Sequence, residues 1–306
     1  MFEEFRGLRQ AELMPDEGTR RGFAAYLERI YGVYGEDGGV DIEILAGQLA
    51  LTPQTRAYLY EGDFTPPEIP YVRGSRPLLE QTVAEVVSPA MSARETALAL
   101  MRRCRDNRDR GLRGGNWFGG SEEELLKRGA IMCNEISRVF VCLCQIAGLR
   151  ARVVCAHISG HMMAEVEVDG GWWWMDSMQG LCCLGDDGRP ASAWDLWQDP
   201  SLLERQGPER LADIRPTGPF TEGDAPEIRA LNVAYRLAVS RQSYFHPKEA
   251  IALGNYFVWE QHKYTYPWFQ RPADPVRLLR GRLREMQIRR ELGWPDFYVN
   301  PYLFVP

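Results

Sequence analysis

The chain has 306 residues, enough for one large domain or for one core domain with extensions. Apolar residues make up 45 % and charged residues 25 %, which is typical of a globular protein and excludes a disordered or fibrous one. The formal net charge of -6 argues against a protein whose main partner is nucleic acid.

The N-terminal segment, residues 1–16, has no basic stretch followed by an apolar run, so no signal peptide is visible. No stretch reaches the ~18 apolar residues that a membrane span needs, so we expect a cytoplasmic protein without a membrane partner. The seven cysteines then indicate reduced thiols rather than a disulfide framework. Structural zinc is the alternative, but the spacing of the pairs Cys142/Cys144 and Cys182/Cys183 is poor for a shared metal ion. We expect neither a metal nor a cofactor.

The first part of the chain is predicted to be an N-terminal extension, residues 1–77. Apolar residues at helical spacing predict an amphipathic helix over residues 17–35. Residues 41–71 have a strand-like or irregular pattern. They lead into the proline-bearing stretch 64–77, which is the best candidate for the boundary with the core.

Two capping boxes open the predicted core, residues 78–195. Ser92 with Glu95 predicts one helix start, and Ser121 with Glu124 predicts the start of a short second helix. Between them lies a glycine-rich loop, residues 111–120. It lacks the pattern of a phosphate-binding loop, so no nucleotide site is predicted there.

A third helix and a β-meander complete the predicted core. Apolar residues at helical spacing predict a helix from Cys133 to about Ala147, and Gly148 is well placed to end it. Three strand-like runs follow, with the turn signal Asp169-Gly170 between the last two; they span residues 151–158, 161–168 and 172–176. A helix laid against an antiparallel sheet gives an α+β fold.

The C-terminal region, residues 196–306, is predicted to be mainly helical and to pack on the core. Its helical patterns cover residues 228–239, 248–260 and 275–292. The arginines of the last pattern are interpreted as a solvated face in preference to an anion-binding surface. The aromatic stretch 256–269 is interpreted as packing in preference to the lining of a substrate cleft.

Cys133 is the first candidate for chemistry. It lies in the first turn of its helix, on the same apolar stripe as Ile136 and Phe140, so its sulfur is expected to point toward the sheet. The N-terminus of a helix favours a thiolate over a thiol. Taken alone, however, Cys133 is more often a small buried core residue.

The predicted hairpin favours a catalytic role for Cys133 over a purely structural one. If Asp169-Gly170 is a two-residue turn, Asp176 lies opposite Met163, and His161 shares their face of the sheet. His161 and Asp176 are then diagonal neighbours that a hydrogen bond can join. A cysteine at a helix N-terminus over this face would complete a nucleophile, a base and an orienting acid. A three-residue bulged turn would reverse the parity and break this arrangement.

Other residues compete for these roles. His157 is the alternative base, but only His161 has a hairpin position beside Asp176. We interpret His246 and His262 as structural. The run Trp172-Trp173-Trp174 invites a carbohydrate-binding interpretation, yet alternation sends the middle ring to the opposite face, which favours packing in a buried strand.

Three segments with a specific joint spacing stand out: Met132-Cys133-Asn134-Glu135 with Ala147-Gly148-Leu149-Arg150-Ala151-Arg152, His161-Met162-Met163-Ala164-Glu165-Val166, and Gly170-Gly171-Trp172-Trp173-Trp174-Met175-Asp176. Together they resemble the core of the transglutaminase-like superfamily, over about residues 85–180. They are similar to the family's cysteine-bearing helix and the strand after it, to its H-x-x-x-E-V strand and to its G-x-W-x-x-x-D strand. This chain differs in having Ile131-Met132 where many relatives have glycine, and Ser177 where proline is common.

The resemblance implies a papain-like arrangement, with the helix of the nucleophile packed on an antiparallel sheet, and thioester chemistry on amides. Cys133, His161 and Asp176 would form the triad, and the substrate would be a peptide, a protein or a small amide. Water as the acyl acceptor makes a hydrolase, and an amine makes an acyltransferase; a silent member that only binds peptides is the third alternative. The Cys133 N–H would be one oxyanion donor, and Trp117 or Asn116 a second.

Overall fold

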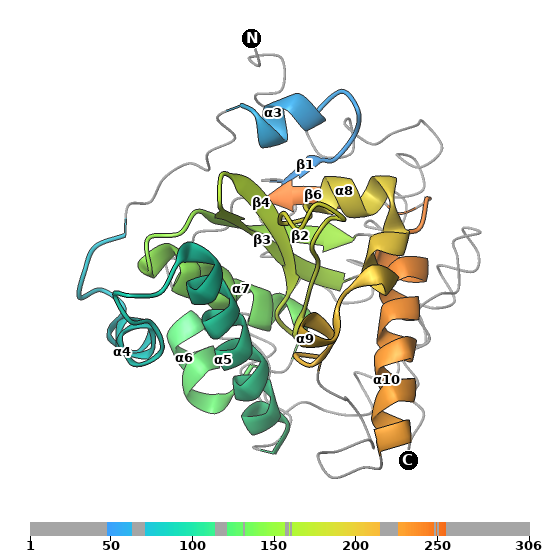
Figure 1. Cartoon of the computed structure of the whole chain (residues 1–306). Coiled ribbons are helices and arrows are strands. Elements are labelled where there is room, and N and C mark those ends of the chain that lie inside the picture. Colours follow the sequence, from blue (N-terminus) through green and yellow to red (C-terminus); the bar gives the residue numbers. More distant parts are fainter. Residues whose placement is uncertain are drawn as a thin grey trace, which may run out of the picture.

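The structure is a computed structural model that describes residues 48–62, 71–113, 121–130, 132–156, 159, 161–214, 226–247, 249 and 251–254 (Figure 1). Its strands are β1 (Gln48–Ala50), β2 (Ala151–Ala156), β3 (His161–Val168), β4 (Gly171–Asp176), β5 (Leu181–Cys182) and β6 (Ile251–Gly254). Its helices are α3 (Arg56–Tyr60), α4 (Pro77–Val86), α5 (Ala93–Arg113), α6 (Glu122–Arg128), α7 (Cys133–Ile146), α8 (Ala193–Gln198), α9 (Pro208–Leu211) and α10 (Pro226–Val239). A 3-10 turn, η4 (Pro200–Arg205), and a π-helical turn, η5 (Ser240–Tyr244), complete the list.

The strands form one six-stranded sheet in the order β1-β6-β2-β3-β4-β5, and all pairings are antiparallel. The predicted meander β2-β3-β4 is its centre, so the predicted α+β class is confirmed. β6 inserts between β1 and β2, and the sheet thus uses strands from both ends of the described chain. The predicted division into three regions stays a prediction.

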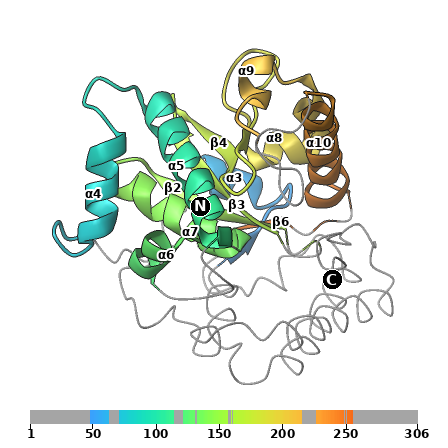
Figure 2. The ribbon, with the colours of Figure 1, turned by 90° about the horizontal axis from the view of Figure 1, so that it is seen from below.

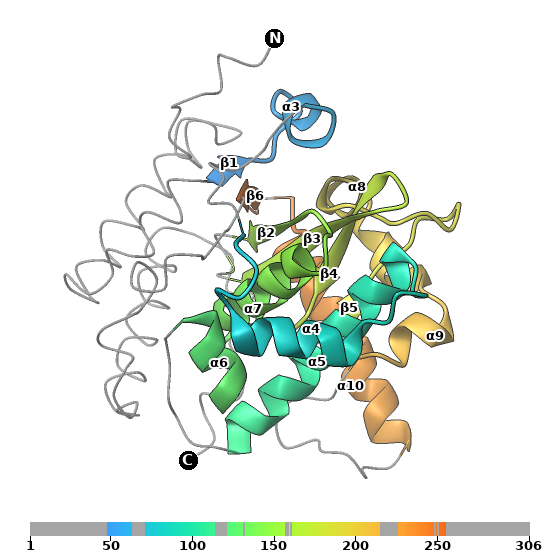
Figure 3. The same cartoon turned by 90° about the vertical axis from the view of Figure 1, so that its left-hand side faces the viewer.

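The sheet separates two apolar layers. On one side, α4, α5, α6 and α7 pack against the even-numbered residues of β3, such as Ala164 and Val166. On the other side, α8, η4 and α10 cover the odd-numbered residues, beginning with Met163. Figures 2 and 3 show the first four helices gathered on a single side of the sheet.

Local sequence explains where the helices of the first layer begin and end. The Ser121 hydroxyl accepts a hydrogen bond from the Glu124 N–H while the Glu124 carboxylate accepts one from the Ser121 N–H, so this predicted capping box is confirmed. Ser92 and Glu95 exchange the same two bonds before α5. Gly148, with φ of 84°, ends α7 in the left-handed conformation that glycine adopts without strain.

Two sequence expectations need correction. The predicted helix over residues 248–260 is wrong at residues 251–254, which form β6. This short apolar run is buried and pairs with a strand on each side, and periodicity does not separate such a run from a buried helix. The stretch 41–71, expected to be strand-like or irregular, contains the short helix α3 as well as β1.

The remaining expectations fall partly outside the described residues. Three predicted features lie outside the described residues: the helices over residues 17–35 and 275–292 and the aromatic stretch 256–269. Among the described residues, no single helix is long and apolar enough to span a membrane. In the same described ranges, α6 and α7 taken together have the required length and composition, but these two helices meet at a bend of 110°.

Candidate active site

The β3–β4 hairpin brings His161 and Asp176 together as predicted. Asp169 and Gly170 have φ of 53° and 76° and form a two-residue turn, and Ala164 lies opposite Met175. The predicted register and parity are therefore confirmed. His161 Nε2 lies 2.8 Å from Asp176 Oδ2, and both side chains are buried.

The Asp176 carboxylate is fixed by backbone donors. Its Oδ1 accepts hydrogen bonds from the N–H groups of Met178 at 3.0 Å and Gln179 at 3.1 Å. Its Oδ2 is thereby left to face His161. These bonds form a turn directly after β4, so the local backbone itself orients the carboxylate toward the imidazole.

Cys133 is the second partner of the same imidazole. Burial by itself would lower the pKa of His161, but the charge of Asp176, its hydrogen bond and the hydrogen bond and charge of Cys133 together raise the pKa to about 10. Cys133 is a second hydrogen-bonding partner of the ring, and because Nε2 is bonded to Asp176, we infer that Nδ1 is the nitrogen left for the Cys133 sulfur. The three side chains therefore form one continuous chain from thiol to carboxylate.

One expectation about this geometry is wrong. Cys133 was expected to approach over the face of the sheet that carries His161 and Asp176. Alternation puts these two residues on the face of Met163 and Trp174, whereas α7 packs on the opposite face. The contact forms because His161 is the first residue of β3 and Cys133 the first of α7, so the two meet at the end of the sheet.

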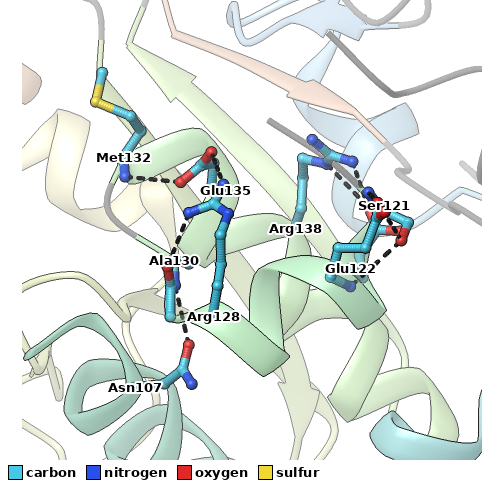
Figure 4. Close-up of polar contacts among 10 residues, drawn as sticks. Asn107, Ser121, Glu122, Arg128, Ala130, Met132, Glu135 and Arg138 are labelled. Atoms are coloured by element: carbon cyan, nitrogen blue, oxygen red, sulfur yellow. Dashed lines mark hydrogen bonds and ion pairs between the residues drawn. The ribbon is translucent and has the colours of Figure 1, made fainter. Parts of the chain in front are cut away.

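The segment before Cys133 is held by a set of buried and partly buried polar contacts (Figure 4). The Asn107 side chain accepts a hydrogen bond from the Ala130 N–H at 3.1 Å. Glu135 accepts one from the Met132 N–H at 3.2 Å and a second from Arg128 at 2.9 Å. Since these contacts come from α5, α6 and α7, they fix the position at which the chain enters the first turn of α7.

A buried ion pair joins α6 to α7 one turn further along. Arg138 Nη2 lies 2.7 Å from Glu122 Oε1, and both side chains are 1 % exposed (Figure 4). Burial raises the pKa of Glu122, and the nearby Arg138 charge opposes that rise. The pair links the capped start of α6 to the helix that carries Cys133.

The structure also brings Tyr244 to the site, a residue that sequence reasoning missed. Its ring stacks on the His161 imidazole with centroids 4.1 Å apart and an interplanar angle of 16°. Gln179 Nε2 donates to the Tyr244 hydroxyl at 3.3 Å. Tyr244 is 83 positions after His161, and no local pattern connects the two.

The other cysteines differ from Cys133 in exposure. Cys133 is partly exposed, whereas the remaining six are buried. Burial raises the pKa of Cys104 far above its usual range and that of Cys182 to about 12. Cys133 is therefore the thiol best presented for reaction.

The three consecutive tryptophans of β4 alternate between the two faces of the sheet, as predicted for a buried strand. Trp173 and Trp174 are fully buried in opposite layers, and the Trp173 ring donates to the Cys183 carbonyl at 2.7 Å. The guanidinium of Arg152 lies 3.8 Å from the centroid of Trp172. The interpretation as packing is favoured by these contacts.

Some predicted participants lie outside the described residues: Asn116, Trp117 and the competing base His157. Within the ranges that the structure describes, no cluster of three or more histidine, cysteine or acidic side chains is arranged to hold a metal ion.

Comparison with known proteins gives one match. Residues 80–177 match the family model described as the transglutaminase-like superfamily. The matched range contains Cys133, His161 and Asp176. The chain matches no curated protein and no solved structure.

Proposed function

Residues 80–177 belong to the transglutaminase-like superfamily, and from this premise we propose that the protein is an amide hydrolase acting through a thioester on Cys133. The observation that carries the proposal is that the buried His161 imidazole has both Asp176 and Cys133 as hydrogen-bonding partners. Asp176 occupies Nε2, which leaves Nδ1 for Cys133. This is the arrangement that an activated nucleophile, a base and an orienting acid require.

In the first half of the reaction, Cys133 starts as a thiolate whose proton is held on His161 Nδ1, and this thiolate attacks the amide carbonyl carbon. Asp176 supports the positive charge of the imidazolium. The tetrahedral intermediate collapses when its C–N bond breaks, and His161 Nδ1 gives its proton to the departing amine. The acyl group remains on sulfur as a thioester.

In the second half, His161 takes a proton from water, and the water oxygen attacks the thioester carbonyl. The C–S bond then breaks, the carboxylic acid leaves, and the Cys133 thiolate and the His161 imidazolium are restored. The negative oxygen of each intermediate needs a donor. The Cys133 N–H is suited to this role because the first N–H groups of a helix have no acceptor within the helix. Asn116 and Trp117 remain candidates for the second donor.

We expect Cys133 to be the residue that a small activated ester acylates. With p-nitrophenyl acetate and rapid acid quenching, intact-mass and peptide mapping should show one acetyl group on Cys133. Cys133→Ala should lower the acylation rate by at least about a thousandfold, because Cys133 is the partly exposed thiol beside His161 and the other six cysteines are buried. Cys104→Ala is the matched control and should leave the rate unchanged, since Cys104 is buried in α5.

Equal acetylation of wild-type protein and Cys133→Ala would contradict the proposal. Added methylamine identifies the acceptor. If water is the natural acceptor, the acetyl group should be lost at a rate that is nearly independent of amine concentration. A rate that rises in proportion to methylamine, with N-methylacetamide as product, would favour an acyltransferase with the same nucleophile.

A further inference from the structure

A segment beyond the family match surrounds His161. Within the segment 240–254, β6 pairs with β2 so that Ile251 lies opposite Ala156, which in turn lies opposite His161. The Glu249 carboxylate accepts a hydrogen bond from the Ser159 N–H at 2.9 Å, two residues before His161. Tyr244 supplies the ring that stacks on the imidazole. The base is thus held by a part of the chain that the family model does not include.

Tyr244 has a fixed place in this segment. It ends the π-helical turn η5, which directly continues α10, and it is 1 % exposed. π-helical turns are rare and often lie at functional sites, since the extra residue per turn changes the direction of a side chain. Gln179 connects the two groups that flank the imidazole: its N–H donates to Asp176, and its amide donates to the Tyr244 hydroxyl.

We propose that Tyr244 is a positioning residue for His161, whose ring face stabilises the imidazolium and keeps Nδ1 directed at Cys133. This inference rests on the proposed function, because it concerns the same base. The face of an aromatic ring carries partial negative charge and attracts a cation that lies over it. At a centroid separation of 4.1 Å and an angle of 16°, the imidazole is stacked on that face.

Three groups act on the charge of His161 from the elements around it. Asp176 on β4 bonds Nε2, Cys133 on α7 is the second hydrogen-bonding partner of the ring, and Tyr244 on η5 stacks on one face of it. The nearby carboxylate of Glu249 is engaged by the Ser159 N–H. Removal of the Tyr244 ring should therefore destabilise the charged form of His161. The Cys133 thiolate, which that positive charge stabilises, should become less populated as well.

The test measures alkylation of Cys133 by iodoacetamide between pH 4 and pH 10, with the modified peptide quantified by mass spectrometry. In Tyr244→Leu, the rate at pH 6 should fall about tenfold, and the pH at which the rate rises should move up by about one unit. Tyr244→Phe keeps the ring face and should stay within about twofold of wild type. A residue that merely fills space would alter stability without moving the pH profile.

Pentafluorophenylalanine at position 244 provides a second variant in case Tyr244→Leu does not fold. It keeps the shape of the Phe ring but reverses the charge of its face, so it should slow alkylation as Tyr244→Leu does. Identical profiles for the Phe and the fluorinated variants would overturn the inference. A wild-type Cys133 that reacts no faster than Cys104 would instead contradict the proposed function, so the two failures are distinguishable.

Discussion

Asp176→Asn is expected to slow the acylation of Cys133 by about 10³ to 10⁴-fold at neutral pH, while the fold is retained. Asp176 Oδ1 accepts two backbone N–H groups, from Met178 and Gln179, and Oδ2 faces His161 Nε2. An asparagine can keep the two backbone bonds only with its oxygen in the Oδ1 position. Its NH₂ group then points at His161.

The reason for the loss is the tautomer of the imidazole. An NH₂ group donates to Nε2, so the ring proton moves to Nδ1, the nitrogen that faces Cys133. A protonated Nδ1 of a neutral ring cannot accept the thiol proton. The carboxylate that supports the imidazolium is lost as well, which adds to the effect.

The experiment compares stopped-flow acylation of wild type, Asp176→Asn and Asp187→Asn. Asp187 has a side chain that is 62 % exposed, so its variant removes one carboxylate without touching the site. We expect wild-type rates for that control. An acylation rate for Asp176→Asn within tenfold of wild type would show that the Asp176 carboxylate does not determine which ring nitrogen of His161 carries the proton.

Removal of one partner from the Glu122–Arg138 pair is expected to lower the free energy of unfolding by about 3–5 kcal/mol. Both side chains are 1 % exposed, so Glu122→Gln leaves the Arg138 charge buried without its counter-charge. The double variant Glu122→Gln with Arg138→Met should recover much of that loss, because it removes both charges.

Urea denaturation followed by circular dichroism measures this effect. Glu61→Gln is the matched control, since Arg56 and Glu61 form an ion pair of similar length, 2.6 Å, with side chains 42 % and 61 % exposed. The control should cost at most about 1 kcal/mol, because solvent screens an exposed pair. A cost below 1 kcal/mol for Glu122→Gln would mean that the pair does not hold α6 to α7.

Local sequence was sufficient to predict the hairpin half of the site. A two-residue turn at Asp169-Gly170 fixes the register, and the register alone brings His161 to Asp176. The capping boxes and Gly148 fixed three helix boundaries for the same reason: each depends on residues at most four positions apart.

The remaining features depend on contacts between distant parts of the chain. The approach of Cys133 from the opposite layer depends on how α7 packs, and both layers of this sheet are apolar. β6 becomes a strand because β1 and β2 offer unpaired edges on either side. Tyr244 reaches His161 through tertiary packing, and no spacing in the sequence encodes that contact.

The central claim is that Cys133, His161 and Asp176 act as one coupled unit. The most direct test is the titration of the His161 ring nitrogens by NMR in protein labelled with ¹⁵N-histidine; the chain has four histidines, and His161→Gln assigns the signal. The ring should stay doubly protonated, as the imidazolium, up to a pH of about 10, because the negative charges of Asp176 and Cys133 favour the charged form. In Cys133→Ala the midpoint should fall, since one of those charges is gone. A midpoint near pH 6.5 that Cys133→Ala leaves unchanged would contradict the coupling of the three residues.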